Sequence, residues 1–249
     1  MNKILVVSDN VRMVNFFQYE VFSGDHLVEN RVDYKFSFSN RTPDSLISLG
    51  LSSINLKDLT EIDKIIFEYD LVVSAHCKQI FPKKLVESVR CVNIHPGLNP
   101  YNRGWYPQVF SILNGLPIGA TIHIMDTNID HGPIIDQIEV SVFSYDTSFD
   151  IYERVFDAEK LLILKNIDSI VSGDYKANLP MSEGNYNSFK EFNELCVLDL
   201  AHIGSLREHL DLLRALTFKG YNNAYYNEDN SRVYVSISFD YKQLSDLDE

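Results

Sequence analysis

The chain has 249 residues, which is enough to bury a full hydrophobic core without disulfides or metal ions. Its 45% hydrophobic and 23% charged residues are typical of a globular protein and exclude a disordered or fibrous chain. The formal net charge of −13 argues against nucleic acid or an anionic membrane as a partner, because both require a basic surface.

The targeting and cysteine signals indicate a cytoplasmic protein. Residues 4–7 are too short an apolar run for a signal peptide, and no run approaches the roughly 18 residues of a membrane span. The three cysteines, Cys77, Cys91 and Cys196, contain no CxxC pair. We therefore expect free thiols in a reducing compartment.

Short apolar runs and amphipathic segments alternate from residue 4 to about residue 176. The predicted strands are residues 4–7, 34–38, 70–74, 90–94 and 120–125. The predicted helices are residues 11–21, 43–49, 59–69, 82–89, 107–114 and 148–172. This rhythm predicts an α/β fold in which helices cover both faces of a mostly parallel sheet.

Polar residues mark the boundaries of two of these helices. Asn10 can cap the first helix, and residues 147–150 fit a capping box. No GxGxxG motif follows the first strand, which argues against dinucleotide binding of the usual kind. Because ligands of open α/β sheets bind beyond the carboxyl ends of the strands, we expect a site formed by residues 74–82, 93–104 and 125–132.

The C-terminal part of the chain has a different pattern. Residues 179–184 have the composition of a linker, residues 206–216 form a predicted helix, and residues 223–226 and 232–239 a predicted hairpin. The helix has four leucines to bury, which are Leu206, Leu210, Leu213 and Leu216.

We accordingly divide the chain into a catalytic domain, residues 1–178, and a C-terminal extension, residues 179–249. An isolated hairpin is marginally stable in water. We therefore expect it to pack on the domain or on a second copy of the chain, which predicts a homodimer.

Asn93 and His95 stand at alternate positions of a strand end, so both side chains leave the same face. Gly97 follows closely and allows the backbone to approach another group. Asp130, in a second loop, could orient the imidazole of His95 and raise its pKa by favouring the charged form. Taken alone, Asn93 and His95 could equally be a turn cap and a buried polar residue.

The amide of Asn93 could donate a hydrogen bond to an oxyanion that develops during attack on a carbonyl. No nucleophilic Ser or Cys is evident beside Asn93, His95 and Asp130. The set therefore predicts acyl transfer directly from a donor to an acceptor.

Several motifs together resemble those of the folate-dependent formyltransferases. They are N-I-H-P at 93–96, R-G at 103–104 with a proline three residues on, N-G at 114–115, T-I-H-I-M at 121–125 and I-D-H-G-P-I-I at 129–135. Residues 93–108 and the tail segment 213–226 most resemble the sugar N-formyltransferases, notably those acting on dTDP-4-amino-4,6-dideoxyglucose.

The resemblance implies a Rossmann-like fold and formyl transfer from 10-formyltetrahydrofolate to the amine of a nucleotide-linked sugar, for surface polysaccharide synthesis. It implies that Asn93 and His95 stabilise the tetrahedral oxyanion, that His95 assists proton removal from the amine, and that Asp130 orients His95. The favoured acceptor is dTDP-4-amino-4,6-dideoxyglucose. A dTDP-3-amino sugar, a UDP-amino sugar and methionyl-tRNA remain alternatives.

The resemblance also implies residues that bind each ligand. For the folate they are Lys78, Gln79, Ile80, Phe81, Met125, Asp126 and Asp130. For the nucleotide sugar they are Asn10, Lys78, His95, Tyr101, Asn102, Arg103, Trp105, Arg214 and Tyr221. Lys78 and Arg103 are the candidate cations for a pyrophosphate, although either could be a solvated charge, and Trp105 could be plain hydrophobic filling.

His123 alternates with apolar residues along a strand, so we interpret it as structural, and we expect no metal site. Methionyl-tRNA is a weak candidate because acidic residues outnumber basic ones two to one from residue 181 onward. A non-catalytic nucleotide-sugar binder is the alternative from a different class. Release of tetrahydrofolate in an activity assay would distinguish it from an enzyme.

Overall fold

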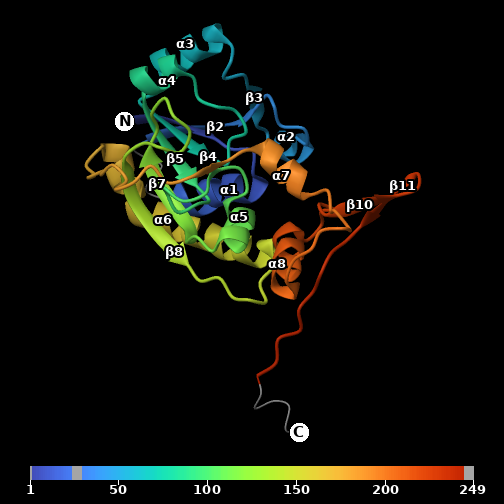
Figure 1. The fold of residues 1–249 in the computed structure, drawn as a ribbon. Helices are drawn as coiled ribbons and strands as arrows, with labels where there is room; N and C mark the ends of the chain where they lie inside the picture. Colours follow the sequence, from blue (N-terminus) through green and yellow to red (C-terminus); the bar gives the residue numbers. More distant parts are fainter. Residues whose placement is uncertain (1, 24–29, 244–249) are drawn as a thin grey trace.

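A seven-stranded sheet forms the centre of the protein, as seen in a computed structural model that describes residues 2–23 and 30–243 (Figure 1). The strand order is β3-β2-β1-β4-β5-β7-β8. The strands are β1 (Asn2–Val7), β2 (Asn30–Ser37), β3 (Ser52–Ile54), β4 (Leu71–Ala75), β5 (Arg90–His95), β7 (Ile118–Ile124) and β8 (Ile134–Val140).

The expected mostly parallel sheet is confirmed, with one difference at its end. Strands β3, β2, β1, β4 and β5 run parallel, whereas β7 is antiparallel to β5 and β8 antiparallel to β7. The apolar pattern of a strand carries no information on its direction. Strand β3 escaped prediction because it is short and two of its three residues are exposed serines, and β8 because its polar residues interrupt the apolar pattern.

Helices cover both faces of the sheet (Figure 1). The α1 helix (Val11–Phe16), which continues into the π-helical turn η1 (Phe17–Val21), packs on one face with α5 (Pro107–Asn114) and α6 (Ser148–Ser172). The α3 (Leu59–Glu68) and α4 (Lys83–Ser88) helices pack on the other. A shorter helix, α2 (Asp44–Ser48), follows β2.

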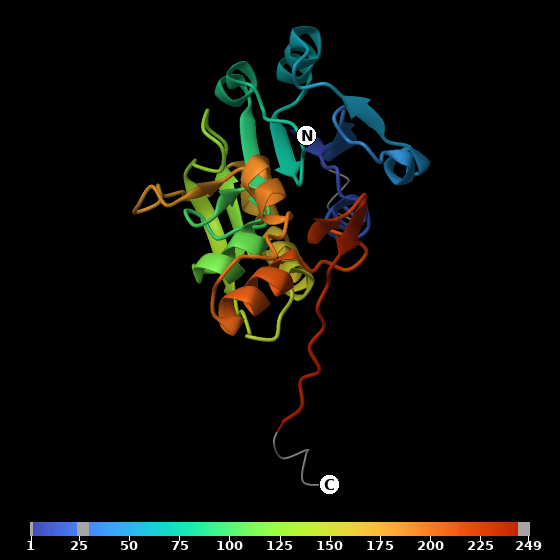
Figure 2. The ribbon, with the colours of Figure 1, turned by 45° about the vertical axis from the view of Figure 1, so that its right-hand side comes forward.

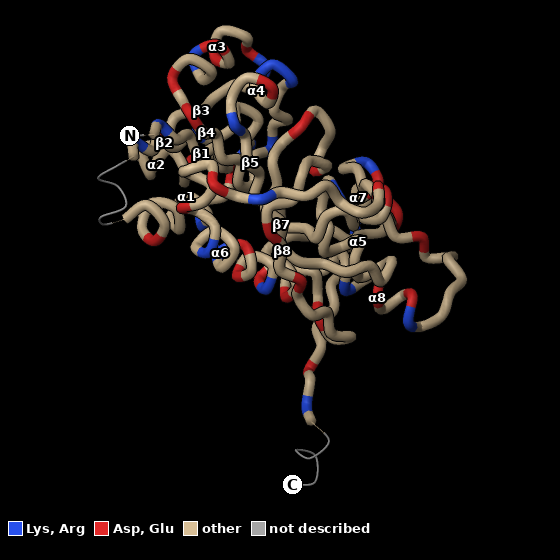
Figure 3. The backbone as a smooth tube through the Cα atoms, turned by 90° about the vertical axis from the view of Figure 1, so that its left-hand side faces the viewer, with Lys and Arg blue, Asp and Glu red and all other residues tan. Residues whose placement is uncertain are grey.

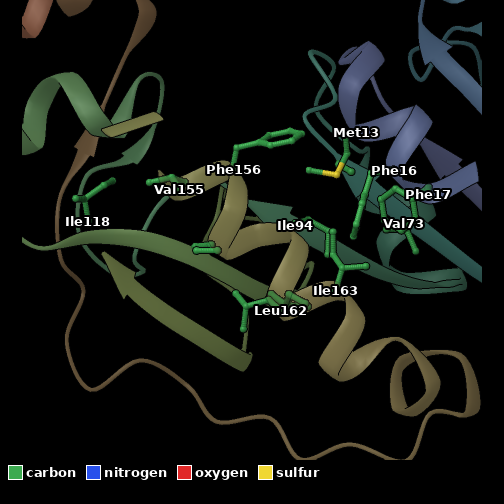
Figure 4. Packing of buried hydrophobic residues seen from close by; sticks show 14 of the residues in the cluster. Met13, Phe16, Phe17, Val73, Ile94, Ile118, Val155, Phe156, Leu162 and Ile163 are labelled. Atoms are coloured by element: carbon green, nitrogen blue, oxygen red, sulfur yellow. The ribbon is translucent and has the colours of Figure 1, made fainter. Parts of the chain in front are cut away.

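The larger core lies between the sheet and α6. In β1, Ile4 and Val6 enter this core, while Leu5 and Val7 enter the core on the other face. This alternation is expected of a strand buried on both faces. Figure 4 shows residues of the α1 helix, the sheet and α6 that belong to the larger core.

The predicted boundaries of the first helix and of α6 are confirmed. Asn10 caps α1 by accepting hydrogen bonds from the backbone N–H groups of Arg12 and Met13. Thr147 and Asp150 form the capping box of α6, and Gly173, at φ +81°, ends it.

The C-terminal extension folds onto the domain. It contains β9 (Tyr186–Asn187), which pairs with β6 (Arg103–Gly104), then α7 (Phe189–Leu195), α8 (Leu206–Leu216), β10 (Tyr225–Glu228) and β11 (Ser231–Tyr234). Its buried residues Phe192, Cys196, Ala215, Leu216 and Ala224 belong to the larger core. The extension thus shares a core with the domain, and the division at residue 178 stays a prediction.

The predicted helix and hairpin of the extension are present, but two details differ. Leu206 is 74% exposed, so its predicted burial is wrong, because the first turn of α8 lies off the core. The second strand of the hairpin ends at Tyr234 rather than at residue 239. The hairpin projects from the body of the molecule (Figure 1). The chain beyond it still contacts the body, because the N–H of Ile237 donates to the hydroxyl of Thr217 at 3.1 Å and the ring of Tyr241 stacks on that of Tyr145 at 4.4 Å, and its last described residues then extend away (Figure 2).

Charges of both signs are interspersed along the chain rather than gathered into one stripe (Figure 3). Within residues 2–23 and 30–243, no helix is both long and apolar enough to cross a membrane.

Candidate active site

A cavity of about 860 Å³ opens at the carboxyl ends of β1, β4 and β5. Its wall combines the ends of these strands with the loop after β7, part of α6 and a segment of the extension. The predicted site residues that line it are Asn10, Lys78, Gln79, Ile80, Phe81, Asn93, His95, Trp105, Met125, Asp126, Asp130 and Tyr221. The location agrees with the rule that open α/β sheets bind ligands at this edge.

Asn93, His95 and Asp130 meet in this cavity. The Nδ2 of Asn93 donates to Oδ1 of Asp130 at 3.0 Å, and Nδ1 of His95 lies 3.5 Å from Oδ2 of Asp130. Asn93 and His95 are 9% and 4% exposed. The three groups are therefore brought together and largely withdrawn from water.

The Asp130 loop is held in an unusual conformation. Asp130 has φ +49°, a left-handed value that costs a residue with a Cβ atom and persists only where the surroundings impose it. The backbone N–H of Gly104 donates to Oδ2 of Asp130 at 3.1 Å. The side chain of Asn99 donates to its carbonyl oxygen at 2.9 Å. These bonds fix the carboxylate against β5.

One nitrogen of His95 is left open. Its Nε2 is buried and has no hydrogen-bond partner among the described residues. A Cβ atom at Gly97 would lie only 2.4 Å from this nitrogen, so glycine is required for the imidazole to sit where it does. Since Nδ1 faces the Asp130 carboxylate, we assign the hydrogen to Nδ1 and a free lone pair to Nε2.

The protonation states follow from burial and neighbouring charge. Burial disfavours a charged Asp130, but His95, His123 and the Gly104 N–H outweigh it and lower the pKa of Asp130 to about 2. Burial lowers the pKa of His95 more than Asp130 raises it. Asp130 raises the pKa of His95 as expected, but desolvation is the larger effect, so the pKa of His95 lies below its ordinary value. His95 is thus a neutral base beside a carboxylate.

His123 belongs to the same cluster, although the sequence favoured a plain structural role. Its Nε2 lies 3.2 Å from Nδ2 of Asn93 and 3.7 Å from Oδ1 of Asp130, and its Nδ1 lies 2.9 Å from the carbonyl oxygen of Ile124. The antiparallel pairing of β5 and β7 puts His123 directly opposite Asn93. Knowledge of this strand pairing would have identified His123 as a member of the cluster.

The loop after β4 forms one wall of the cavity. Asp9 holds it by accepting from the backbone N–H of Lys78 at 2.6 Å, and the exposed Lys78 side chain lines the cavity. The side chain of Gln79 accepts from the N–H of Leu56 at 3.0 Å, so it already has a partner. Ile80 is 70% exposed at the cavity wall, whereas Phe81 is 4% exposed and also belongs to the smaller core.

The loop after β7 forms the facing wall. Met125 is half-buried against the smaller core. Asp126 faces Nδ1 of His131 at 3.2 Å, and Nε2 of His131 lies 3.2 Å from Glu183 in the extension. The two carboxylates raise the pKa of His131. The catalytic loop is therefore tied to the extension on its outer side.

Four predicted substrate residues do not line the cavity, so the geometry gives no support to that role. Tyr101 lies in the turn after Leu98. Asn102 is fully buried, and its Oδ1 accepts from the side chains of Asn114, Asn185 and Asn187 at 2.7, 2.7 and 3.1 Å. It is a structural junction.

The two arginines of this group are also engaged inside the protein. Arg103 donates to Glu183 at 3.0 Å and to the carbonyl oxygen of Ile129 at 3.3 Å. Arg214 is 6% exposed, and its guanidinium bonds Asp211 and the carbonyl oxygens of Phe143 and Asp146. Their charges are compensated where they stand.

Aromatic rings line the remaining wall. Trp105 is 37% exposed with its ring 5.0 Å from that of Phe189, and Tyr221, 69% exposed, stacks edge-on against Phe218 at 5.6 Å. Phe149 and Tyr152 of α6 join this wall. Sequence reasoning missed both α6 residues, since their spacing is compatible with an ordinary helix face.

Glu159 is another residue that the sequence reading passed over. It lies on the buried stripe of α6, four residues after Val155 and three before Leu162, where an apolar side chain is expected. A carboxylate on the apolar face of a predicted helix is the feature of the sequence that could have identified Glu159 as a candidate functional residue. It is fully buried and bonds His76 at the end of β4.

Two family models match the chain. The Formyl transferase model matches residues 55–167, and the model of the N-formyltransferase dimerization C-terminal domain matches residues 191–241. A dTDP-4-amino-4,6-dideoxyglucose formyltransferase of Mycobacterium tuberculosis is 48% identical over 177 residues, which are 71% of this chain and 76% of the relative.

Solved structures agree with these matches. A sugar N-formyltransferase from a Shewanella species shares 49% identity and superposes with a TM-score of 0.95, covering 98% of this chain and 100% of that one. A 4-N formyltransferase from Francisella tularensis shares 45% identity with a TM-score of 0.89 and covers 97% and 99% of the two chains. The resemblance found in the sequence motifs is confirmed, and the chain belongs to the formyltransferase family.

Proposed function

We propose that the protein is a folate-dependent sugar N-formyltransferase that transfers a formyl group from 10-formyltetrahydrofolate to the 4-amine of dTDP-4-amino-4,6-dideoxyglucose. The observation that carries the proposal is the buried group of Asn93, His95 and Asp130, with an open Nε2 on His95. The named activity of a relative at 48% identity supports the choice of acceptor. A role in surface polysaccharide synthesis is consistent with such a product.

His95 acts as the base in this proposal. Its pKa lies below the usual value because the ring is buried, so it is neutral at pH 7 and Nε2 can accept a proton from the attacking amine. Asp130, with a pKa of about 2, stays ionised and faces Nδ1. The carboxylate thereby orients the imidazole and stabilises it once it is protonated.

Asn93 stabilises the oxygen that gains negative charge. Its amide now donates to Asp130 and lies 3.2 Å from the ring nitrogen of His123, so both of its hydrogens face acceptors. Hydrogen bonds to a carboxylate are stronger than those to a neutral nitrogen. The hydrogen facing His123 is therefore the one that we expect to turn toward the substrate oxygen.

The chemistry of the cavity suits the proposed ligands. Among the described residues, the buried Nε2 of His95 has no hydrogen-bond partner, and a substrate amine would supply one. The loops of residues 76–81 and 125–130 would hold the folate, whose bound form supplies the formyl group. Lys78, Trp105 and Tyr221 remain our candidates for contacts with the nucleotide sugar.

The decisive experiment incubates the purified protein with 10-formyltetrahydrofolate and dTDP-4-amino-4,6-dideoxyglucose. We expect release of tetrahydrofolate and a sugar product heavier by one formyl group in place of one hydrogen. A dTDP-3-amino sugar, a UDP-amino sugar and methionyl-tRNA should react at least tenfold more slowly. Binding of the nucleotide sugar without release of tetrahydrofolate would instead indicate a non-catalytic binder.

The extension supports a homodimer. Leu200, Ile203 and Leu206 are 72%, 94% and 74% exposed and lie close together in the sequence of the extension, in the part that matches a dimerization domain. Exposed apolar residues of this kind are typical of interfaces. Sedimentation should give twice the chain mass at micromolar concentration.

The three free cysteines are compatible with the cytoplasm, where we propose that the enzyme acts.

A further inference from the structure

A second polar cluster lies beside the catalytic one and takes no part in the proposed chemistry. It consists of Glu159 and Tyr152 on α6, His76 at the end of β4, and Asn10 after β1. The Nε2 of His76 lies 2.9 Å from both carboxylate oxygens of Glu159. The Nδ2 of Asn10 lies 3.4 Å from Nδ1 of His76 and 2.9 Å from the hydroxyl of Tyr152.

Burying this polar cluster costs folding free energy, which points to a functional role. Glu159 is fully buried on a helix face that is otherwise apolar, and burial raises its pKa. An apolar pair of the same volume is commonly at least as stable as a buried ion pair. His76 also has a left-handed φ of +61°. Strained residues of this kind cluster at functional sites.

The direction of every hydrogen bond in the cluster follows from the helix cap. The Oδ1 of Asn10 accepts from the backbone N–H groups of Arg12 and Met13 at 2.9 and 3.2 Å. The amide nitrogen of Asn10 must therefore face the cluster and donate. His76 then accepts at Nδ1 and carries its hydrogen on Nε2, which donates to Glu159.

Tyr152 is left as the free end of this network. Its oxygen accepts from Asn10, so its own hydrogen remains available to donate, and no described residue accepts it. Burial raises the pKa of Tyr152 to about 12, so the hydroxyl keeps its hydrogen at neutral pH. Tyr152 lines the cavity and its ring lies 5.3 Å from that of Phe218, on the wall formed with the extension.

We propose that Tyr152 determines specificity for the acceptor by donating a hydrogen bond to an oxygen of the nucleotide-linked sugar, and that Glu159, His76 and Asn10 are positioning residues that fix its polarity. The proposal rests on the proposed function. It also gives Asn10 a role different from direct contact with the nucleotide, because both ends of its amide already have partners inside the protein.

The first test compares Tyr152→Phe with the wild-type protein by calorimetric titration and by steady-state kinetics. We expect the Kd and KM of the nucleotide sugar to rise about 3- to 10-fold for a neutral sugar oxygen, and more for a phosphate oxygen. The KM of the folate and the melting temperature should stay close to wild type.

Titration with dTDP alone identifies the oxygen that is bound. Weaker binding of both dTDP and the dTDP-sugar would indicate a phosphate oxygen, whereas weaker binding of the dTDP-sugar alone would indicate an oxygen of the sugar. Unchanged binding of both ligands to Tyr152→Phe, with an active wild-type enzyme, would overturn the inference and leave the proposed function intact. A wild-type protein that binds no nucleotide sugar would overturn both.

The second test reverses the network. Asn10→Asp keeps an oxygen to cap α1 but turns the donor that faces Tyr152 into an acceptor. The hydroxyl of Tyr152 would then donate its hydrogen to the new carboxylate instead of to the ligand. Asn10→Asp should weaken binding of the nucleotide sugar as Tyr152→Phe does. In the double variant the two effects should not add. Additive losses would mean that the new charge acts on the ligand directly, and would overturn the positioning role of Asn10.

Discussion

The protein has two buried pairs of a histidine and a carboxylate at the ends of adjacent strands, and they differ in what the second ring nitrogen meets. In the pair of His95 and Asp130 that nitrogen has no hydrogen-bond partner in the part of the chain that the structure describes. In the pair of His76 and Glu159 it faces the amide of Asn10. A base needs a free lone pair, so only the first pair can take a proton from a substrate. Residue type alone would not separate them.

The largest expected effect follows from exchanging each histidine for glutamine. His95→Gln removes the base and should lower kcat by about 10³-fold, within the range for general base catalysis. His76→Gln, the matched control, should keep kcat within tenfold of wild type. Stopped-flow release of tetrahydrofolate measures both. Equal losses in the two variants would remove the distinction between the pairs.

Gly97→Ala should have the next largest effect. Its Cβ atom would lie 2.4 Å from Nε2 of His95, so the ring must shift from its position against Asp130. Misplacement of a reacting group by an ångström can cost about 100-fold in rate. Gly204→Ala, in the extension, serves as the control, because its Cβ atom would lie 3.0 Å from the flexible end of Glu208 and 3.4 Å from the rings of His202 and His209. A fully active Gly97→Ala protein would contradict the role of Nε2.

The pH dependence distinguishes burial from charge as the dominant influence on His95. Because burial lowers its pKa, kcat/KM should be level above pH 6.5 and fall up to tenfold per unit only at lower pH. In the unfolded chain His95 takes up a proton near pH 6.5, whereas in the folded protein it does so only at lower pH. The contribution of His95 therefore decreases the free energy of unfolding as the pH falls below about 6.5. An acid limb centred above pH 6.5 would show that Asp130 dominates.

The smallest effect is expected outside the cavity. His131→Gln breaks the contacts to Asp126 and Glu183 at the surface, where ion pairs contribute little. We expect kcat to change less than threefold. Because its pKa is raised, His131 is charged at pH 6, and the substitution should change kcat mainly at low pH. The difference in kcat between pH 6 and pH 9 should therefore be larger in the wild-type protein than in the variant. A large loss at both pH values would show that the surface contacts hold Asp130.

Much of the fold was predictable, because strands buried on both faces form apolar runs that stand out from amphipathic helices. The direction of β7 was not, since an apolar run is the same in either direction. Without the direction and register of β7, the sequence could not place His123 opposite Asn93, where the antiparallel pairing puts it. β8 was missed because its Asp136, Gln137 and Glu139 interrupt the apolar pattern.

The site shows the same division between local and tertiary information. Asn93 and His95 were predictable from two-residue spacing on one strand, and Asp130 from its motif. The partners of Arg103 lie at least 26 residues away in the sequence. Those of Arg214 lie at least 68 residues away, apart from Asp211, with which it forms a local ion pair. A sequence shows that a charge exists but not which carbonyl oxygens will surround it.

The junction at Asn102 limits how this protein can be recombined with its relatives. The fully buried side chain of Asn102 ties the loop after β5 to Asn185 and Asn187 on the other side of the linker. A chimera joined at residue 178 would separate Asn102 from the partners it has here. An exchange of the extension would therefore have to move residues 99–104 and 183–187 together, as one unit assembled from two distant parts of the chain.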